Sequence, residues 1–223
     1  MSTEDPALLD TRDMVALHRS FRRVLADAPG QIASVREGDV QRSRLLADYV
    51  ADALWLLHEH HIGEDELLYP LLAERVPEEA ELFARMEEQH HAVAEGIEVA
   101  QRAVERFGRS ASVADGDELA AACGSLLQST EEHLVDEEEH VLPIAARVIT
   151  PPEWGAMPSQ ALSRYEGPRL WLPFGIAYEG MPPDIQEAML VRIPPAVAEM
   201  WKSGGSDAYA AEMAEIRVGG EAR

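Results

Sequence analysis

The sequence predicts an all-α protein: an antiparallel up-down four-helix bundle with a C-terminal extension of short helices. Two observations support this fold class. Four long amphipathic helical patterns precede about residue 150, and the short loops between them favour antiparallel neighbours. After Thr150 the composition changes, because nine of the 14 prolines and three of the four tryptophans lie there. We therefore expect a bundle over residues 1–149 and a helical extension, packed on the bundle, over residues 150–223.

The first two helical patterns are each limited or disturbed by a proline. The first spans roughly residues 6–28, and the pair Pro29-Gly30 is expected to end it. The second runs from about residue 39 to 75, and Pro70 is expected to kink it because proline lacks a backbone N–H.

The remaining helices follow from the same signals. The third pattern covers about residues 78–107, where Gly108 is expected to stop it, and the fourth begins near Asp117. In the extension, proline at the first turn predicts short helices over residues 183–192 and 195–202.

Composition argues against several classes of function. The chain has 223 residues and a formal net charge of -22, which disfavours binding to nucleic acid or to an anionic membrane. Cys123 is the single cysteine, so no intramolecular disulfide can form. No apolar run approaches the roughly 18 residues of a membrane span, and the acidic segment before Met14 lacks the pattern of a signal peptide. We expect a soluble, cytoplasmic protein.

The eight histidines are distributed unevenly, and the last 83 residues contain none. Four of them, one per long helical pattern, fall within apolar stripes: His18, His60, His90 and His133. At about 1.5 Å per residue, the last three lie at matching heights in an antiparallel bundle. His18 fits this alignment less well, because fewer helical residues follow it than precede His60.

A short motif occurs twice and places a carboxylate one helical turn after two of these histidines. His60 precedes Glu64 by four residues, as His133 precedes Glu137, and each motif continues into further acidic residues and a proline. Residues four apart share a helix face, which here is the apolar face. A buried histidine and carboxylate are costly unless they are paired, and a metal ion pairs them well. The rest of the acidic run at residues 136–139 is expected to be a solvated face.

The types of ligand restrict the metal and the number of ions. Imidazole and carboxylate without thiolate suit iron, manganese or zinc, and two carboxylates with four or more histidines suit a pair of ions. A ferritin-like plan needs a glutamate in each of two helices and an ExxH motif in the other two. The sequence has Glu87/His90 and Glu137/His140, but no glutamate lies near His18. The ferritin-like plan is therefore rejected.

Residues 14–145 resemble a hemerythrin-like (HHE cation-binding) domain of the bacterial type. The motifs that carry the resemblance are Leu17-His18-Arg19, His60-His61-x-x-Glu64-Asp65 with Leu68-Tyr69-Pro70, Glu88-Gln89-His90, and His133-x-x-x-Glu137-Glu138 with Leu142-Pro143.

This resemblance implies an oxo- and carboxylate-bridged di-iron centre. By similarity, Glu64 and Glu137 would bridge the two irons, and His18, His60, His90 and His133 would be terminal ligands. Animal hemerythrins have a second histidine one turn along the third helix, where this chain has Ala94. His61 is the candidate for the missing ligand, and His91 competes for that role.

Three functions follow from the resemblance. The first is binding of O2, NO or peroxide in sensing, storage, or the response to oxidative or nitrosative stress. The second is a di-iron oxidoreductase that consumes peroxide as a catalase does, or that activates O2 for a small organic substrate held beside Trp171 or Phe174. The third is a bundle in which the metal, zinc for example, is only structural. We also expect a homodimer formed through the extension.

Overall fold

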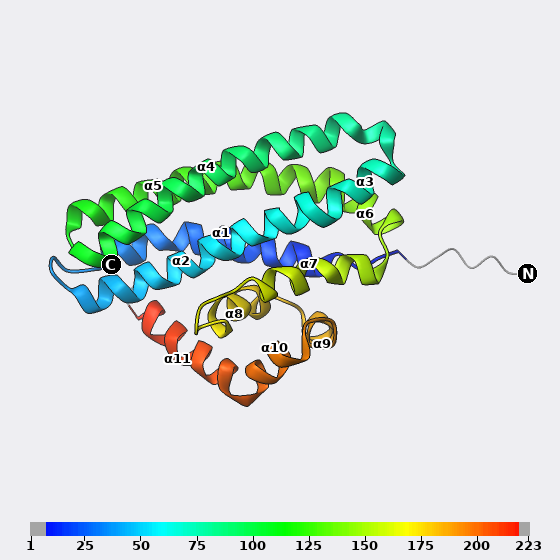
Figure 1. Cartoon of the computed structure of the whole chain (residues 1–223). Coiled ribbons are helices and arrows are strands. Elements are labelled where there is room, and N and C mark those ends of the chain that lie inside the picture. The colour runs from blue at the N-terminus through cyan, green and yellow to red at the C-terminus, as the bar shows by residue number, and fades with distance from the viewer. Residues whose placement is uncertain (1–7, 219–223) are drawn as a thin grey trace, which may run out of the picture.

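A computed structural model describes residues 8–218, and within that range every regular element is helical. Figure 1 shows the long helices side by side and a group of shorter ones along one flank. The predicted all-α bundle is confirmed. The long helices are α1 (Arg12–Ala33), α2 (Val40–Gly63), α4 (Ala80–Ser110) and α5 (Val113–Asp136).

The long helices alternate in direction along the chain, as the colour gradient in Figure 1 shows. Helix α5 packs closely on α1 and on α4, and α4 packs closely on α2. Helices α1 and α2 touch each other less, so this side of the bundle is the most open. The extension covers that side.

Two of the long helices pass through a π-helical turn before they continue. Helix α2 leads into η1 (Glu64–Leu68) and α3 (Tyr69–Arg75), and α5 leads into η3 (Glu137–Val141) and α6 (Leu142–Val148). In each turn the N–H of the residue before a proline, Tyr69 or Leu142, bonds the carbonyl five residues back. The wider turn accommodates Pro70 and Pro143, whose rings would clash with the carbonyl of the preceding α-helical turn.

The ends expected for the first and third helices, at Pro29 and at Gly108, are wrong. Helix α1 continues through Pro29 to Ala33, because Gln31 and Ile32 are buried and proline removes only one helical hydrogen bond. The start expected near residue 6 lies outside the described residues, and α1 begins at Arg12. The longer α1 also gives His18 more helical residues toward the α1–α2 loop, which improves its alignment with His60.

Gly108 does not stop α4, which ends at Ser110 with Ala111 in the left-handed conformation at φ 50°. A Cβ at Gly108 would lie 3.0 Å from the Cβ of Ala47, so the glycine allows α2 and α4 to approach. Helix α5 begins at Val113, earlier than expected, because the Ser112 side chain accepts the N–H of Asp115 as an N-cap.

The extension consists of α7 (Pro151–Ser163), α8 (Trp171–Glu179), α9 (Pro183–Arg192), α10 (Pro195–Met200), η4 (Trp201–Gly205) and α11 (Ser206–Arg217). Helix α7 packs on α2 and η1, and α8 packs on α1 and α2. Trp154 is buried and its indole N–H lies 3.1 Å from both carboxylate oxygens of Asp13 on α1. The extension is thus joined to the bundle by apolar packing and by buried polar contacts.

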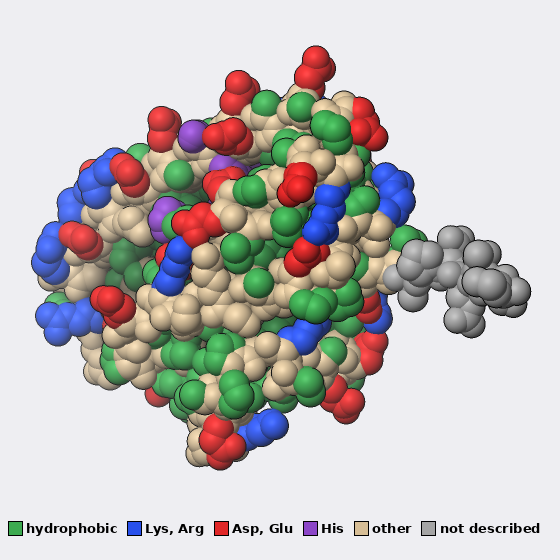
Figure 2. Space-filling view, turned by 45° about the vertical axis from the view of Figure 1, so that its right-hand side comes forward, with side chains coloured by type: hydrophobic (Ala, Val, Ile, Leu, Met, Phe, Trp, Pro, Cys, Tyr) green, Lys and Arg blue, Asp and Glu red, His purple; other side chains and the backbone are tan. Residues whose placement is uncertain are grey.

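The surface carries both signs of charge. Figure 2 shows acidic and basic side chains interspersed over the visible face, with hydrophobic side chains between them. Across residues 8–218, no helix is both long enough and apolar enough to cross a membrane.

Candidate metal centre

The seven histidine and glutamate residues expected to bind metal meet at one level inside the bundle. They form two groups whose ligand atoms lie within 4.8 Å of one another, and Glu64 belongs to both. All seven side chains are buried, although they come from six separate elements. The first group is His18, His60, Glu64 and Glu137, and the second is His61, Glu64, His90 and His133.

The first group joins α1 to the end of α2. The Nε2 atoms of His18 and His60 are 3.1 Å apart. His60 Nε2 lies 3.2 Å from Glu64 Oε1, and His18 Nε2 lies 3.3 Å from Glu137 Oε2. Two imidazoles and two carboxylates thus face one small volume.

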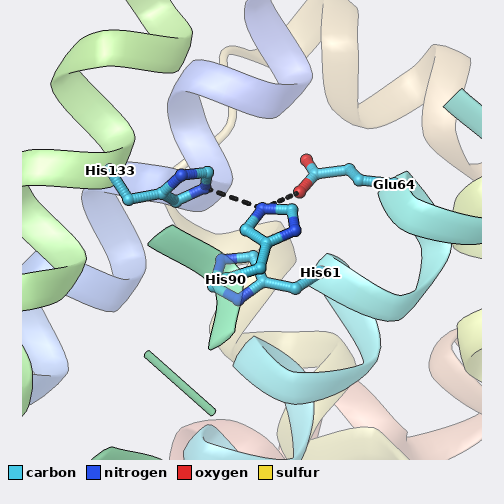
Figure 3. A group of neighbouring side chains, drawn as sticks. All are labelled: His61, Glu64, His90 and His133. Carbon is cyan, nitrogen blue, oxygen red and sulfur yellow. Dashed lines mark hydrogen bonds and ion pairs between the residues drawn. The ribbon is translucent and has the colours of Figure 1, made fainter. Parts of the chain in front are cut away.

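The second group contains three imidazoles, from α2, α4 and α5. Figure 3 shows His90 between His133 and Glu64, and its Nε2 lies 3.2 Å from His133 Nε2 and 3.4 Å from Glu64 Oε2. The His61 ring stacks on His90 with centroids 4.3 Å apart. His61 Nε2 is buried and has no hydrogen-bond partner.

The two carboxylates lie between the histidine groups. Glu64 directs Oε1 toward His60 and Oε2 toward His90. Glu137 Oε2 is 3.3 Å from His18 Nε2 and 3.8 Å from His133 Nε2. None of the four carboxylate oxygens has a hydrogen-bond partner, although both side chains are fully buried. Unpaired buried carboxylates are costly, so this donor set fits cations held between the groups.

Burial and charge set the protonation of the cluster. Burial lowers the pKa of His60 to about 4 and that of His133 to about 3, so these rings are neutral, as metal ligands must be. Burial and the charge of Glu64 raise the pKa of Glu137 well above its ordinary value. Burial would raise the pKa of Glu64 as well, but the imidazoles of His60 and His90 outweigh it and lower this pKa to about 2.

Acidic side chains outside the cluster hold two of the rings. His90 Nδ1 lies 2.7 Å from Asp65 Oδ1, and His18 Nδ1 lies 2.9 Å from Glu138 Oε1, which also accepts Arg22 Nη1 at 2.6 Å. A carboxylate can only accept, so each Nδ1 carries the proton and Nε2 is left to face the centre. Glu138 therefore does not belong to a simple solvated face, contrary to expectation. The signal was present in the sequence, since an acidic residue directly follows each glutamate of the repeated motif.

Other histidines lie apart from this cluster. His91 is exposed, and His140 is exposed with Nδ1 3.0 Å from the carbonyl of Asp136. Tyr69 is buried with its ring centroid 5.5 Å from that of His90, and its hydroxyl has no hydrogen-bond partner. Of the two competitors for the additional ligand position, His61 thus lies in the cluster and His91 lies outside it.

Comparison with known protein families agrees with this arrangement. The family model described as the hemerythrin HHE cation binding domain matches residues 9–145, a range that contains all seven cluster residues. Comparison with curated proteins and with solved structures finds no match. The extension lies outside the range that the family model covers.

Proposed function

Because this chain belongs to the hemerythrin HHE cation-binding domain family, we propose that it holds two iron ions and binds O2, NO or peroxide at them. Its role would be sensing, storage, or the response to oxidative or nitrosative stress. The observation that carries this proposal is the pair of buried carboxylates, Glu64 and Glu137, each facing histidines of both groups without a hydrogen-bond partner. A single structural ion would not need two such shared carboxylates.

The residues divide into two unequal ligand sets. Glu64 and Glu137 would be shared by both ions, with His18 and His60 on one ion and His61, His90 and His133 on the other. The ion beside His18 and His60 would therefore receive one protein ligand fewer. An open coordination position is what a small exogenous ligand requires, so we assign ligand binding to that ion.

When bound, the two irons would supply this open position and the electrons for redox chemistry with a diatomic ligand or peroxide. The chain itself contributes the imidazoles, and Asp65 and Glu138 orient two of them, His90 and His18, from outside the cluster. Apolar side chains on both sides of the polar layer, including Phe21 and Met86, exclude water from it.

An enzymatic role is the alternative, as a catalase-like or O2-activating oxidoreductase. A cavity between the bundle and the extension favours it, because His60 forms part of the cavity wall. Both roles would use the same metal centre. They would differ in the fate of the ligand, which is released unchanged by a binding protein and converted by an enzyme.

The direct test is metal analysis together with an optical spectrum of the anaerobically reduced protein before and after exposure to air. The proposal expects about two irons per chain and a new near-ultraviolet or visible band. A band that persists indicates binding, and one that decays while peroxide or substrate is consumed indicates turnover. Zinc, or one ion with a featureless spectrum, would contradict the proposal and favour a structural metal.

A further inference from the structure

A cavity lies where the extension meets the α1–α2 side of the bundle. It has about 90 Å³ of space open to water-sized molecules, whereas one water needs on the order of 10–15 Å³ on such a measure. It therefore has room for a small organic molecule. Helices α1 and α2 form one wall, and α7, α8 and α9 form the other, so the bundle alone would not enclose it.

The wall of this cavity is mainly carbon. Methionine, leucine and aromatic side chains contribute most of it, among them Met14, Leu56, Met157, Phe174, Met181 and Met189. Such a lining favours an apolar ligand, and methionine side chains adapt to irregular shapes. The family match ends before α7, so this wall is a feature of the extension.

Two carboxylates belong to the cavity wall. Asp13 is already occupied, because it accepts the Trp154 indole N–H and pairs with Arg192 Nη1 at 3.1 Å. Glu59 is buried, and its Oε2 has no hydrogen-bond partner, with Arg164 Nη1 3.5 Å away as its ion pair. A buried carboxylate oxygen without a hydrogen-bond partner in an apolar cavity favours a ligand that can donate a hydrogen bond, and it disfavours an anion.

We propose that this cavity binds a small organic molecule with an apolar body and one hydrogen-bond-donating end, an alcohol or an amine. The donating end would meet Glu59, and the apolar body would lie among the side chains of α7, α8 and α9. Binding itself follows from the shape and chemistry of the wall and does not require metal.

The position of the cavity links it to the metal centre. His60 lines the cavity and also belongs to the histidine group with two imidazoles. A molecule in the cavity would thus lie beside the ion that has the open position. This second part rests on the proposed function, and it would make the cavity the site of an organic substrate or effector.

The test is calorimetric titration of the full chain, as purified, with benzyl alcohol and benzylamine, and with benzoate and toluene for comparison. We expect the alcohol and the amine to bind more tightly than toluene, and benzoate not to bind. Saturable binding should weaken at least tenfold in the double variant Ala161→Leu/Ala177→Leu, whose new side chains fill the cavity. The matched control is Ala156→Leu/Ala188→Leu, since both alanines are exposed and lie outside the wall.

A second variant tests the expected contact between Glu59 and the hydrogen-bond donor of the ligand. Glu59→Leu should weaken the binding of benzyl alcohol and leave the binding of toluene unchanged, provided circular dichroism shows the same helix content. Absence of saturable binding, equal binding of benzoate, or equal loss in the control variant would overturn the cavity proposal. The iron spectrum is a separate readout: if benzyl alcohol binds but the protein holds no iron pair, the cavity stands and the proposed function fails. If iron is present and its spectrum does not change when benzyl alcohol binds, the proposed link between the cavity and the metal centre fails.

Discussion

The two segments His60–Pro70 and His133–Pro143 build the centre in nearly the same way, and their differences explain its asymmetry. Each places a histidine and a glutamate one turn apart, then a π-helical turn, then a proline. In each, the acidic residue after the glutamate accepts from a histidine on another helix: Asp65 from His90, and Glu138 from His18. The metal-binding layer is therefore close to a twofold repeat.

The two segments differ at several positions, and two of these differences change the surroundings of the ligand cluster. His61 in the first segment corresponds to Leu134 in the second, and Tyr69 corresponds to Leu142. His61 makes the second ligand group richer by one imidazole, while Leu134 is part of the apolar core. A near-symmetric scaffold thus holds two unequal ligand groups because of a single side chain.

The largest expected effect, on iron content, comes from removing the glutamate that each segment contributes. Glu64→Ala and Glu137→Ala should each bring iron from about two per chain to near zero, because either carboxylate would serve both ions. His60→Ala should also lose iron. Inductively coupled plasma mass spectrometry measures this, and His140→Ala is the control with unchanged iron. Equal iron in Glu64→Ala and His140→Ala would contradict the ligand assignment.

The next effect comes from making the first segment resemble the second. His61→Leu leaves both groups with two imidazoles, so we expect lower metal stoichiometry and a changed iron spectrum. His91→Leu, on the exposed side of α4, should change neither. If His61→Leu retains full metal content, the centre has fewer ligands than proposed, and if His91→Leu loses metal, that residue is a ligand.

A smaller effect should follow from the acidic residues that hold the rings. Asp65→Asn and Glu138→Gln should each weaken metal affinity by about tenfold, because loss of such a partner typically costs 10–100-fold. Competition with a chelator of known affinity measures this change. Glu139→Gln alters an exposed neighbour of Glu138 and should have no effect. Unequal results for the first two variants would show that the repeat is less symmetric than the contacts indicate.

The smallest effect is expected at Tyr69. Its hydroxyl is buried without a partner, so Tyr69→Phe should leave the free energy of unfolding of the metal-free protein unchanged or raise it by up to about 1 kcal/mol. Urea denaturation measures this difference. A loss of more than about 1 kcal/mol would mean that the hydroxyl has a hydrogen-bond partner in solution.

Much of the centre was accessible from the sequence because it depends on helical spacing. His60 with Glu64, and His133 with Glu137, share a helix face whatever surrounds them. Four amphipathic patterns with short loops likewise favour one bundle topology. Those regularities predicted the four helices and six residues of the cluster, and the family match supports the same interpretation. The seventh, His61, was a candidate only through the resemblance, with His91 as its competitor.

Helix ends were harder to predict because local signals compete with packing. Pro29 and Gly108 both favour helix termination, yet α1 and α4 continue past them. Burial of Ile32 and the approach of Ala47 to Gly108 outweigh those local preferences. Neither contact can be read from a window of neighbouring residues.

The sequence by itself determined which side chains share a helix face, and so it determined the bundle and six of the seven members of the metal cluster. Only the tertiary structure decided between His61 and His91, since each adjoins a stripe histidine and differs in what faces it across the bundle. The same holds for Glu138, which reaches His18 on α1, and for the cavity, whose walls come from helices far apart in the chain. Spacing along one helix fixes direction, but contact between helices depends on how whole elements pack.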